Sequence, residues 1–99
     1  MNMEQVRDAA RWHHKIVRER AFELNPWWDA DIRAAIRRGR VVTGMTRDQV
    51  LLSWGRPWAI DTSKTANNTY ETWRYGYYDE MTSLNFVNGR LEIINEFDR

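Results

Sequence analysis

The 99-residue sequence contains no cysteine, and that absence removes several classes of chemistry at once. The chain as given has no disulfide, no thiolate nucleophile, no zinc–thiolate site and no cysteine that could accept a lipid. No apolar run approaches the roughly 20 residues that a membrane-spanning helix needs, and the charged N-terminus lacks the apolar segment of a signal peptide. We therefore expect neither a transmembrane segment nor a signal segment in this chain.

A strong net charge is also missing, because 15 Lys/Arg against 14 Asp/Glu leave a formal net charge of +1. That balance argues against a chain built mainly to bind a polyanion. A length of 99 residues and a hydrophobic content of 42% favour one globular domain with a sizeable core. The six tryptophans have two explanations. They are either large core rings or anchors of an interface, where Trp and Tyr are enriched.

Helical spacing predicts two helices in the first forty residues. The first covers 3–24, because apolar residues recur there at steps of three and four and Asn25-Pro26 then stops the helix. The second runs from about residue 26 or 29 to residue 38, with Gly39 just beyond its end. Charges interrupt the apolar stripe of the first helix, so this helix packs either loosely on the domain or against a partner.

A third, short helix has the best-defined boundaries in the sequence. Thr46 and Gln49 form a capping box at its start, because a Thr followed three residues later by Gln satisfies two free backbone N–H groups. Gly55 ends the helix and Pro57 prevents its continuation. After Pro57 the apolar period changes from that of a helix to that of a strand.

Strand-like segments fill the rest of the chain. They cover residues 58–62, 69–78, 83–87 and 91–97. Asn88-Gly89 predicts a tight hairpin before the last segment, which is either a fourth strand or the continuation of the third, with Leu91 and Ile93 pointing inward. The order predicts an α+β fold: N-terminal helices followed by a three- to four-stranded antiparallel β-meander, with the helices packed on one sheet face.

The aromatic strand at 69–78 holds the candidate partner-binding residues. Alternation along a strand divides them into two rows on opposite faces. The rows are Tyr70, Arg74 and Tyr78 on one face, and Trp73, Tyr75 and Tyr77 on the other. The period does not tell which row faces the core. We expect whichever row is exposed to contact another protein.

No pattern in the sequence indicates a catalytic or metal site. His13 and His14 are adjacent on a helix and point about 100° apart, so they cannot easily share one ion. Ser53 lacks the spacing of a nucleophile elbow, and the glycines form no phosphate-binding loop. We therefore expect no catalytic residue, no metal and no cofactor, and we expect the protein not to be an enzyme.

Basic residues gather near the end of the second predicted helix. They are Arg33, Arg37, Arg38 and Arg40. The negative end of the helix dipole favours cations there, which explains the cluster without a ligand. A nucleic-acid patch is the alternative interpretation, although no aromatic RNA-stacking motif accompanies these arginines.

The second half of the chain resembles the SmpA/OmlA domain, the family of the BamE-type outer-membrane assembly lipoproteins. The resemblance rests on four motifs in order: Gly44-Met45-Thr46 before a short helix, Gly55-Arg56-Pro57 after it, Trp73-Arg74-Tyr75 in a strand, and Asn88-Gly89 in a hairpin. It covers roughly the last 60% of the chain. It suggests a SmpA/OmlA-like domain at 26–99 that follows a helical extension at 1–25. This sequence differs from the lipoproteins at its start, where a charged helix stands and no lipid-acceptor cysteine is found.

The resemblance implies a protein-binding domain of the bacterial cell envelope, on the periplasmic side, with a role in outer-membrane assembly or envelope maintenance. It brings no catalytic residues to the chain. Two alternatives stay open at this point. One is a self-associating structural domain whose N-terminal helix pairs between copies or exchanges between them. The other is a basic nucleic-acid-associated module that uses the arginines of residues 33–40.

Overall fold

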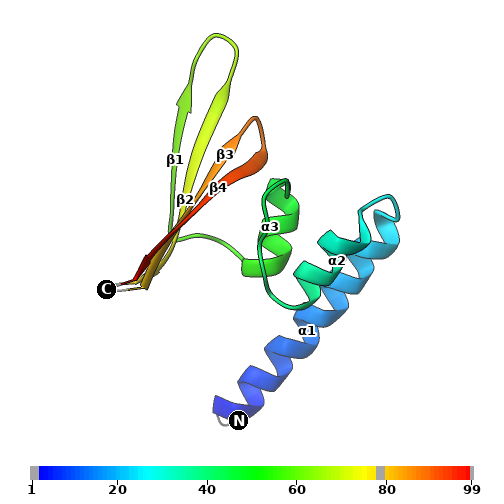
Figure 1. The fold of residues 1–99 in the computed structure, drawn as a ribbon. Coiled ribbons are helices and arrows are strands. Elements are labelled where there is room, and N and C mark those ends of the chain that lie inside the picture. Colours follow the sequence, from blue (N-terminus) through cyan, green and yellow to red (C-terminus); the bar gives the residue numbers. More distant parts are fainter. Residues whose placement is uncertain (1–2, 78–79, 99) are drawn as a thin grey trace.

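The computed structural model describes residues 3–77 and 80–98, with side chains described for residues 14–76 and 80–96. Three helices precede four strands, which confirms the α+β arrangement (Figure 1). The elements are α1 Met3–Leu24, α2 Ala30–Arg37, α3 Arg47–Trp54, β1 Ala59–Lys64, β2 Thr69–Tyr77, β3 Glu80–Val87 and β4 Arg90–Asp98.

The boundaries of α3 follow the local signals in the sequence. The Thr46 hydroxyl accepts a hydrogen bond from the Gln49 backbone N–H, and the Gln49 side-chain oxygen accepts one from the Thr46 backbone N–H at 2.9 Å. This is the predicted capping box. Gly55 follows the helix with φ 76° and ψ −163°, a backbone region that is essentially restricted to glycine. Both ends of α3 are thus determined by residues within ten positions of each other.

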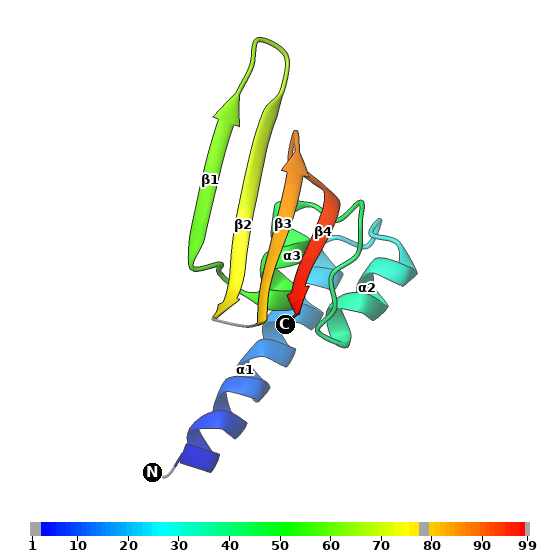
Figure 2. The same ribbon diagram turned by 60° about the vertical axis from the view of Figure 1, so that its left-hand side comes forward.

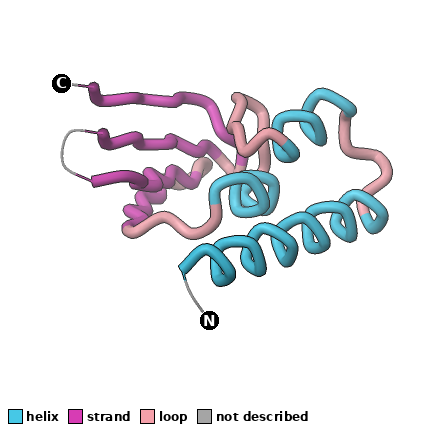
Figure 3. Tube along the Cα trace, turned by 90° about the horizontal axis from the view of Figure 1, so that it is seen from below, coloured by secondary structure: helices cyan, strands magenta, loops and turns pink. Residues whose placement is uncertain are grey.

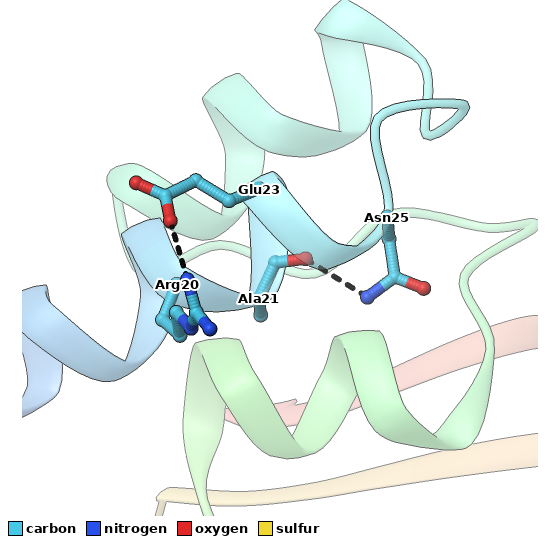
Figure 4. Close-up of polar contacts among 4 residues, drawn as sticks. All are labelled: Arg20, Ala21, Glu23 and Asn25. Carbon is cyan, nitrogen blue, oxygen red and sulfur yellow. Dashed lines mark hydrogen bonds and ion pairs between the residues drawn. The ribbon is translucent and has the colours of Figure 1, made fainter.

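The turn between α1 and α2 is also stabilised locally. The Asn25 side-chain amide donates to the Ala21 carbonyl oxygen at 2.8 Å, and the Asn25 backbone N–H donates to the same oxygen at 2.9 Å, so Asn25 holds the last turn of α1 (Figure 4). The Trp28 backbone N–H donates to the Asn25 carbonyl at 3.1 Å. This turn delays α2, which begins at Ala30 rather than at Pro26, with Asp29 at its N-cap position.

The strands form one antiparallel sheet in the order β1-β2-β3-β4, so each strand pairs only with its neighbours in sequence (Figure 2). The predicted hairpin between β3 and β4 is confirmed, with Asn88 at φ 52° and Gly89 at φ 81°. The last segment is therefore a fourth strand and not a continuation of the third. β3 begins at Glu80, three residues earlier than predicted.

A β-bulge changes which residues of β4 face the helices. The register shifts between Asn85 and Phe86, so that Phe86 pairs with Leu91 while Asn85 pairs with Ile93. One extra residue in β4 moves every later side chain to the opposite face. Leu91 points inward as predicted, but the prediction for Ile93 is wrong: Ile93 is exposed, and the partly buried Ile94 packs against the core instead.

The core extends from the sheet to all three helices, with α3 at its centre. Its buried members are Phe22, Ala35, Ile36, Met45, Val50, Trp73, Leu84, Phe86 and Leu91. All three helices lie on one side of the sheet, and α3 stands between the sheet and α1 (Figures 1 and 3). The segment before α3 also bonds to β4, because the Gly44 N–H donates to the Leu91 carbonyl at 2.7 Å and the Leu91 N–H donates to the Met45 carbonyl at 2.8 Å. These bonds tie the helical layer to the last strand.

Helix α1 packs on the other helices through its C-terminal half. Phe22 is buried and meets the Trp28 ring edge-on. Arg18 donates to the Leu52 and Ser53 carbonyl oxygens, both at 2.9 Å, and Glu19 forms two hydrogen bonds with Arg37 of α2. The N-terminal half of α1 extends beyond the other elements (Figures 1 and 2). The helix predicted as an extension thus contributes to the core at one end.

Candidate functional site

The face of the sheet that points away from the helices is the candidate functional surface, and we call it the open face. Strand pairing places the buried residues Trp73, Leu84 and Phe86 on the helix-facing side. Their sequence neighbours therefore lie on the open face. The open-face residues of the described strands include Ala59, Asp61, Ser63, Tyr70, Thr72, Arg74, Met81, Ser83, Asn85, Val87, Ile93 and Asn95.

Side-chain bonds order the centre of the open face. The Arg74 guanidinium lies 2.9 Å from the Asp61 carboxylate on the neighbouring strand. The Thr72 hydroxyl donates to the Asn85 side-chain oxygen at 2.8 Å, across β2 and β3. The Arg74 Nε is buried and has no hydrogen-bond partner among the described residues. The centre of this face is therefore polar, and most of its side chains are already fixed by bonds to one another before any ligand binds.

A shallow hollow lies at one end of this polar centre. Thr72, Arg74, Met81, Thr82 and Ser83 line it, and its volume is about 270 Å³. The lining combines the apolar side chain of Met81 with the hydroxyl of Ser83 and the guanidinium of Arg74. Such a hollow has room for one protruding side chain of a partner, with apolar contacts and hydrogen-bond donors close together.

Apolar groups stand at the edges of the polar centre. Tyr70 is 40% exposed on β2, and Ile93 is 52% exposed on β4. Of the two predicted rows, the structure therefore presents the one that contains Tyr70 and Arg74 on the open face. Tyr78, the third member of that row, lies outside the described residues, and so does the side chain of Tyr77.

The two described members of the other predicted row, Trp73 and Tyr75, pack on the helix side of the sheet, so they are not part of the open face. Trp73 is buried, and its ring centroid is 4.5 Å from that of Phe86. Tyr75 packs edge-on against Trp54 at 5.1 Å, and its hydroxyl donates to the Gly55 carbonyl at 2.8 Å. The physical reason is the helix layer, which covers this face of β2. Period-two alternation alone contains no information on where that layer packs.

Burial raises the pKa of the Tyr75 hydroxyl to about 12. The proton is thus held more tightly in the folded protein than in the unfolded chain, where a tyrosine titrates near pH 10. This contribution to stability is complete below about pH 10 and is lost as the pH rises towards 12. We expect the free energy of unfolding, measured by urea denaturation, to fall over that interval more steeply for the wild type than for Tyr75→Phe. Equal slopes for the two proteins would contradict this assignment.

Sequence reasoning missed most members of the open face, among them Asp61, Asn85 and Ile93. Asp61 and Asn85 belong to the site only because strand pairing brings them beside Arg74 and Thr72. Ile93 reaches this face through the bulge in β4. The alternation of residues along β1 and β3 was the one usable signal. It could have shown which residues share a face of each strand with Asp61 or Asn85, but not which residues of β2 lie beside them.

The arginine cluster and the histidine pair are the other features that the sequence singled out. Arg37 is bound to Glu19 and lies 4.8 Å above the Phe22 ring, so one of the four clustered arginines stabilises the contact between α1 and α2. Glu19 in turn holds the pKa of Arg37 above its usual value through their hydrogen bond. His14 is exposed, the His13 side chain lies outside the described residues, and no group of His, Asp and Glu in the described part could hold a metal ion.

The motifs behind the family resemblance have structural roles in this fold. Met45 is fully buried, Thr46 caps α3, Gly55 ends it, and Asn88 with Gly89 forms the last hairpin. Comparison of the chain with protein-family models, curated proteins and solved structures finds no match. Within the described residues, no helix combines the length and apolar character that crossing a bilayer requires.

Proposed function

We propose that this chain is a non-enzymatic protein-binding domain whose open face contacts another protein through Tyr70, Arg74 and the hollow beside Arg74. The observation that carries the proposal is the division of the sheet into two faces. One face packs on the helices, while the other presents exposed Tyr70 and Ile93 around a centre of bonded polar side chains.

The composition of the open face suits a reversible protein interface. Such interfaces are about as polar as the rest of a protein surface, and they are enriched in Tyr and Arg. The bonds between Arg74 and Asp61 and between Thr72 and Asn85 already order these side chains. A partner would therefore lose less conformational entropy on binding here than on a surface of mobile side chains.

The resemblance to the SmpA/OmlA domain supports the setting of this proposal. Its motifs at residues 44–46, 55–57, 73–75 and 88–89 suggest a bacterial cell-envelope protein. On that basis we propose a periplasmic role in outer-membrane assembly or envelope maintenance, in which this domain binds a protein component. Fold alone does not fix such a role, so the binding surface and the setting need separate tests.

Immobilised wild-type chain should retain at least one protein from a bacterial envelope extract, and Tyr70→Ser should weaken that binding by about 10- to 30-fold. The reason is that truncating a contacting Tyr typically costs about 1.4–2 kcal/mol of binding free energy, which corresponds to about 10- to 30-fold in affinity. Affinity for the retained protein, once purified, would be measured by titration calorimetry. Because Tyr70 is exposed, the thermal midpoint of the variant should stay close to that of the wild type.

Trp58→Ser is the matched control, since Trp58 is also an exposed aromatic residue but precedes β1 and lies outside the open face. It should keep wild-type affinity. A partner that binds wild type, Tyr70→Ser and Trp58→Ser equally would contradict the assignment of the open face. Retention of no protein at all from an envelope extract would count against the proposed setting.

A further inference from the structure

Helix α1 turns an apolar side towards solvent. It is the layer farthest from the sheet, with α3 in between (Figures 1 and 3). Its contacts with the body come from Arg18, Glu19 and Phe22. At 100° per residue, Arg18 and Phe22 lie about 120–160° around the helix axis from Ile16, and Glu19 lies about 60° from it. Ile16 and Leu24 are both exposed, whereas Val17 lines a hollow with Leu51 and Leu52 of α3. The side that packs is therefore partly charged, while apolar side chains face outward.

Three exposed residues of α1 lie along this outward side and an exposed tryptophan follows them in the next turn; we call these four the outer row: Ile16, Arg20, Glu23 and Trp27. The three residues within α1 fall in an arc of about 60°, and Trp27 follows in the turn after the helix. Ile16 is 57% and Trp27 73% exposed. The side chains of Arg20 and Glu23 are 67% and 68% exposed and lie 3.0 Å apart (Figure 4).

The outer row is complementary to itself. Read forwards, it is apolar, basic, acidic and apolar, at steps of four, three and four residues. Read from Trp27 back to Ile16, the steps are again four, three and four residues, but the acidic residue now precedes the basic one. A second copy placed antiparallel therefore sets Arg20 against Glu23 and Ile16 against Trp27, twice over. That is the pattern of an isologous two-fold contact, in which each residue meets the same partner in both directions.

We propose that the outer row is a homodimer contact, in which two copies of α1 pair antiparallel about a two-fold axis near residues 21 and 22. The mixed charge of the row favours this occupant, because a strongly charged partner would be attracted by one of the two charged residues and repelled by the other. This contact is separate from the open face and does not depend on the proposed function.

The contact is small, so the dimer should be weak. Within α1, residues 16–24 span only about 13 Å at the rise of a helix, so the contact buries little surface and falls at the low end of interface sizes. We expect half-association at roughly 100 µM, within a range of about tenfold either way. Sedimentation equilibrium from about 20 µM to 2 mM covers that range. A wild-type chain that stays monomeric throughout would overturn the proposal.

Exchanging single charges gives a sharper test. Arg20→Glu places two acidic residues in each row, and Glu23→Arg places two basic residues there. Each variant alone should associate at least about 10-fold more weakly than the wild type, because both charge contacts of the dimer become repulsive. An equimolar mixture of the two variants should recover association to within about threefold of wild type, since every acidic residue then meets a basic one.

Controls separate this effect from general changes in charge or folding. Lys64→Glu and Glu92→Arg carry the same changes in charge at exposed positions of β1 and β4, and they should associate like the wild type. Ile16→Ser keeps the charges and should also weaken association. Unchanged association of Arg20→Glu, or a mixture no better than its components, would overturn the antiparallel pairing.

Discussion

Replacing Phe86 with alanine is expected to lower the free energy of unfolding by about 3–5 kcal/mol. The Phe86 side chain is 1% exposed, and its ring packs against Trp73. It stands on β3 beside Leu91, whose backbone bonds to Met45 in the segment before α3. The cavity would therefore open where the sheet meets the helical layer, so collapse of either layer alone could not fill it.

Urea denaturation followed by circular dichroism would measure this loss. For a domain of about 100 residues, each kcal/mol shifts the thermal midpoint by roughly 4–8 °C, so the shift should exceed about 10 °C. Ile93→Ala is the control, since Ile93 is 52% exposed on the adjacent strand, and its cost should stay within about 0.5 kcal/mol. Comparable losses for the two variants would contradict the bulged register of β4.

Replacing Arg18 with methionine is expected to cost about 1.5–3 kcal/mol, the range for hydrogen bonds that involve a charged group. Methionine keeps a long unbranched side chain but removes both bonds to the Leu52 and Ser53 carbonyl oxygens. Those carbonyls belong to the last turn of α3, where the helix dipole adds partial negative charge. The substitution therefore leaves two acceptors without their cationic donor and weakens the hold of α3 on α1.

Amide hydrogen exchange would locate the effect of Arg18→Met. Protection should fall in α1 and in the last turn of α3, while the β3–β4 hairpin, held by Leu84 and Phe86, should lose protection only through the fall in global stability. Arg38→Met is the control, because Arg38 is exposed and follows α2. A loss of stability that is equal in both variants would show that the Arg18 bonds do not stabilise the fold.

Features encoded by neighbouring residues were predictable from the sequence. The capping box of α3 needs only Thr46 and Gln49, and the last hairpin needs only Asn88 and Gly89. In each case the chemistry that selects the backbone geometry lies within four residues. The α+β fold followed from the order of such local signals, and the helix limits of α1 followed from Asn25 and Pro26.

Features that depend on distant residues were not predictable in the same way. Ile93 alternates correctly with Leu91 in the sequence, but a bulge formed with β3 turns it outward. The apolar period of α1 identified a stripe, yet Ile16 and Val17 are exposed, while Phe22 on another side of the helix is buried. Periodicity describes a helix by itself, whereas α2 and α3 decide which side is covered. Alternation along β2 likewise could not tell whether the Tyr70 row or the Trp73 row is covered by the helices.

The strand order has a consequence for how this protein is made. Sheet pairing between sequence neighbours keeps loops short, which favours fast folding once the chain is complete. The sheet's share of the core, however, includes Leu84, Phe86 and Leu91, and all three leave the ribosome after the helices. The helices emerge first and must wait for the surface on which they pack. Folding during synthesis would thus be completed only when the last strand is released, so a stalled or shortened chain would expose its helical core to chaperones and proteases.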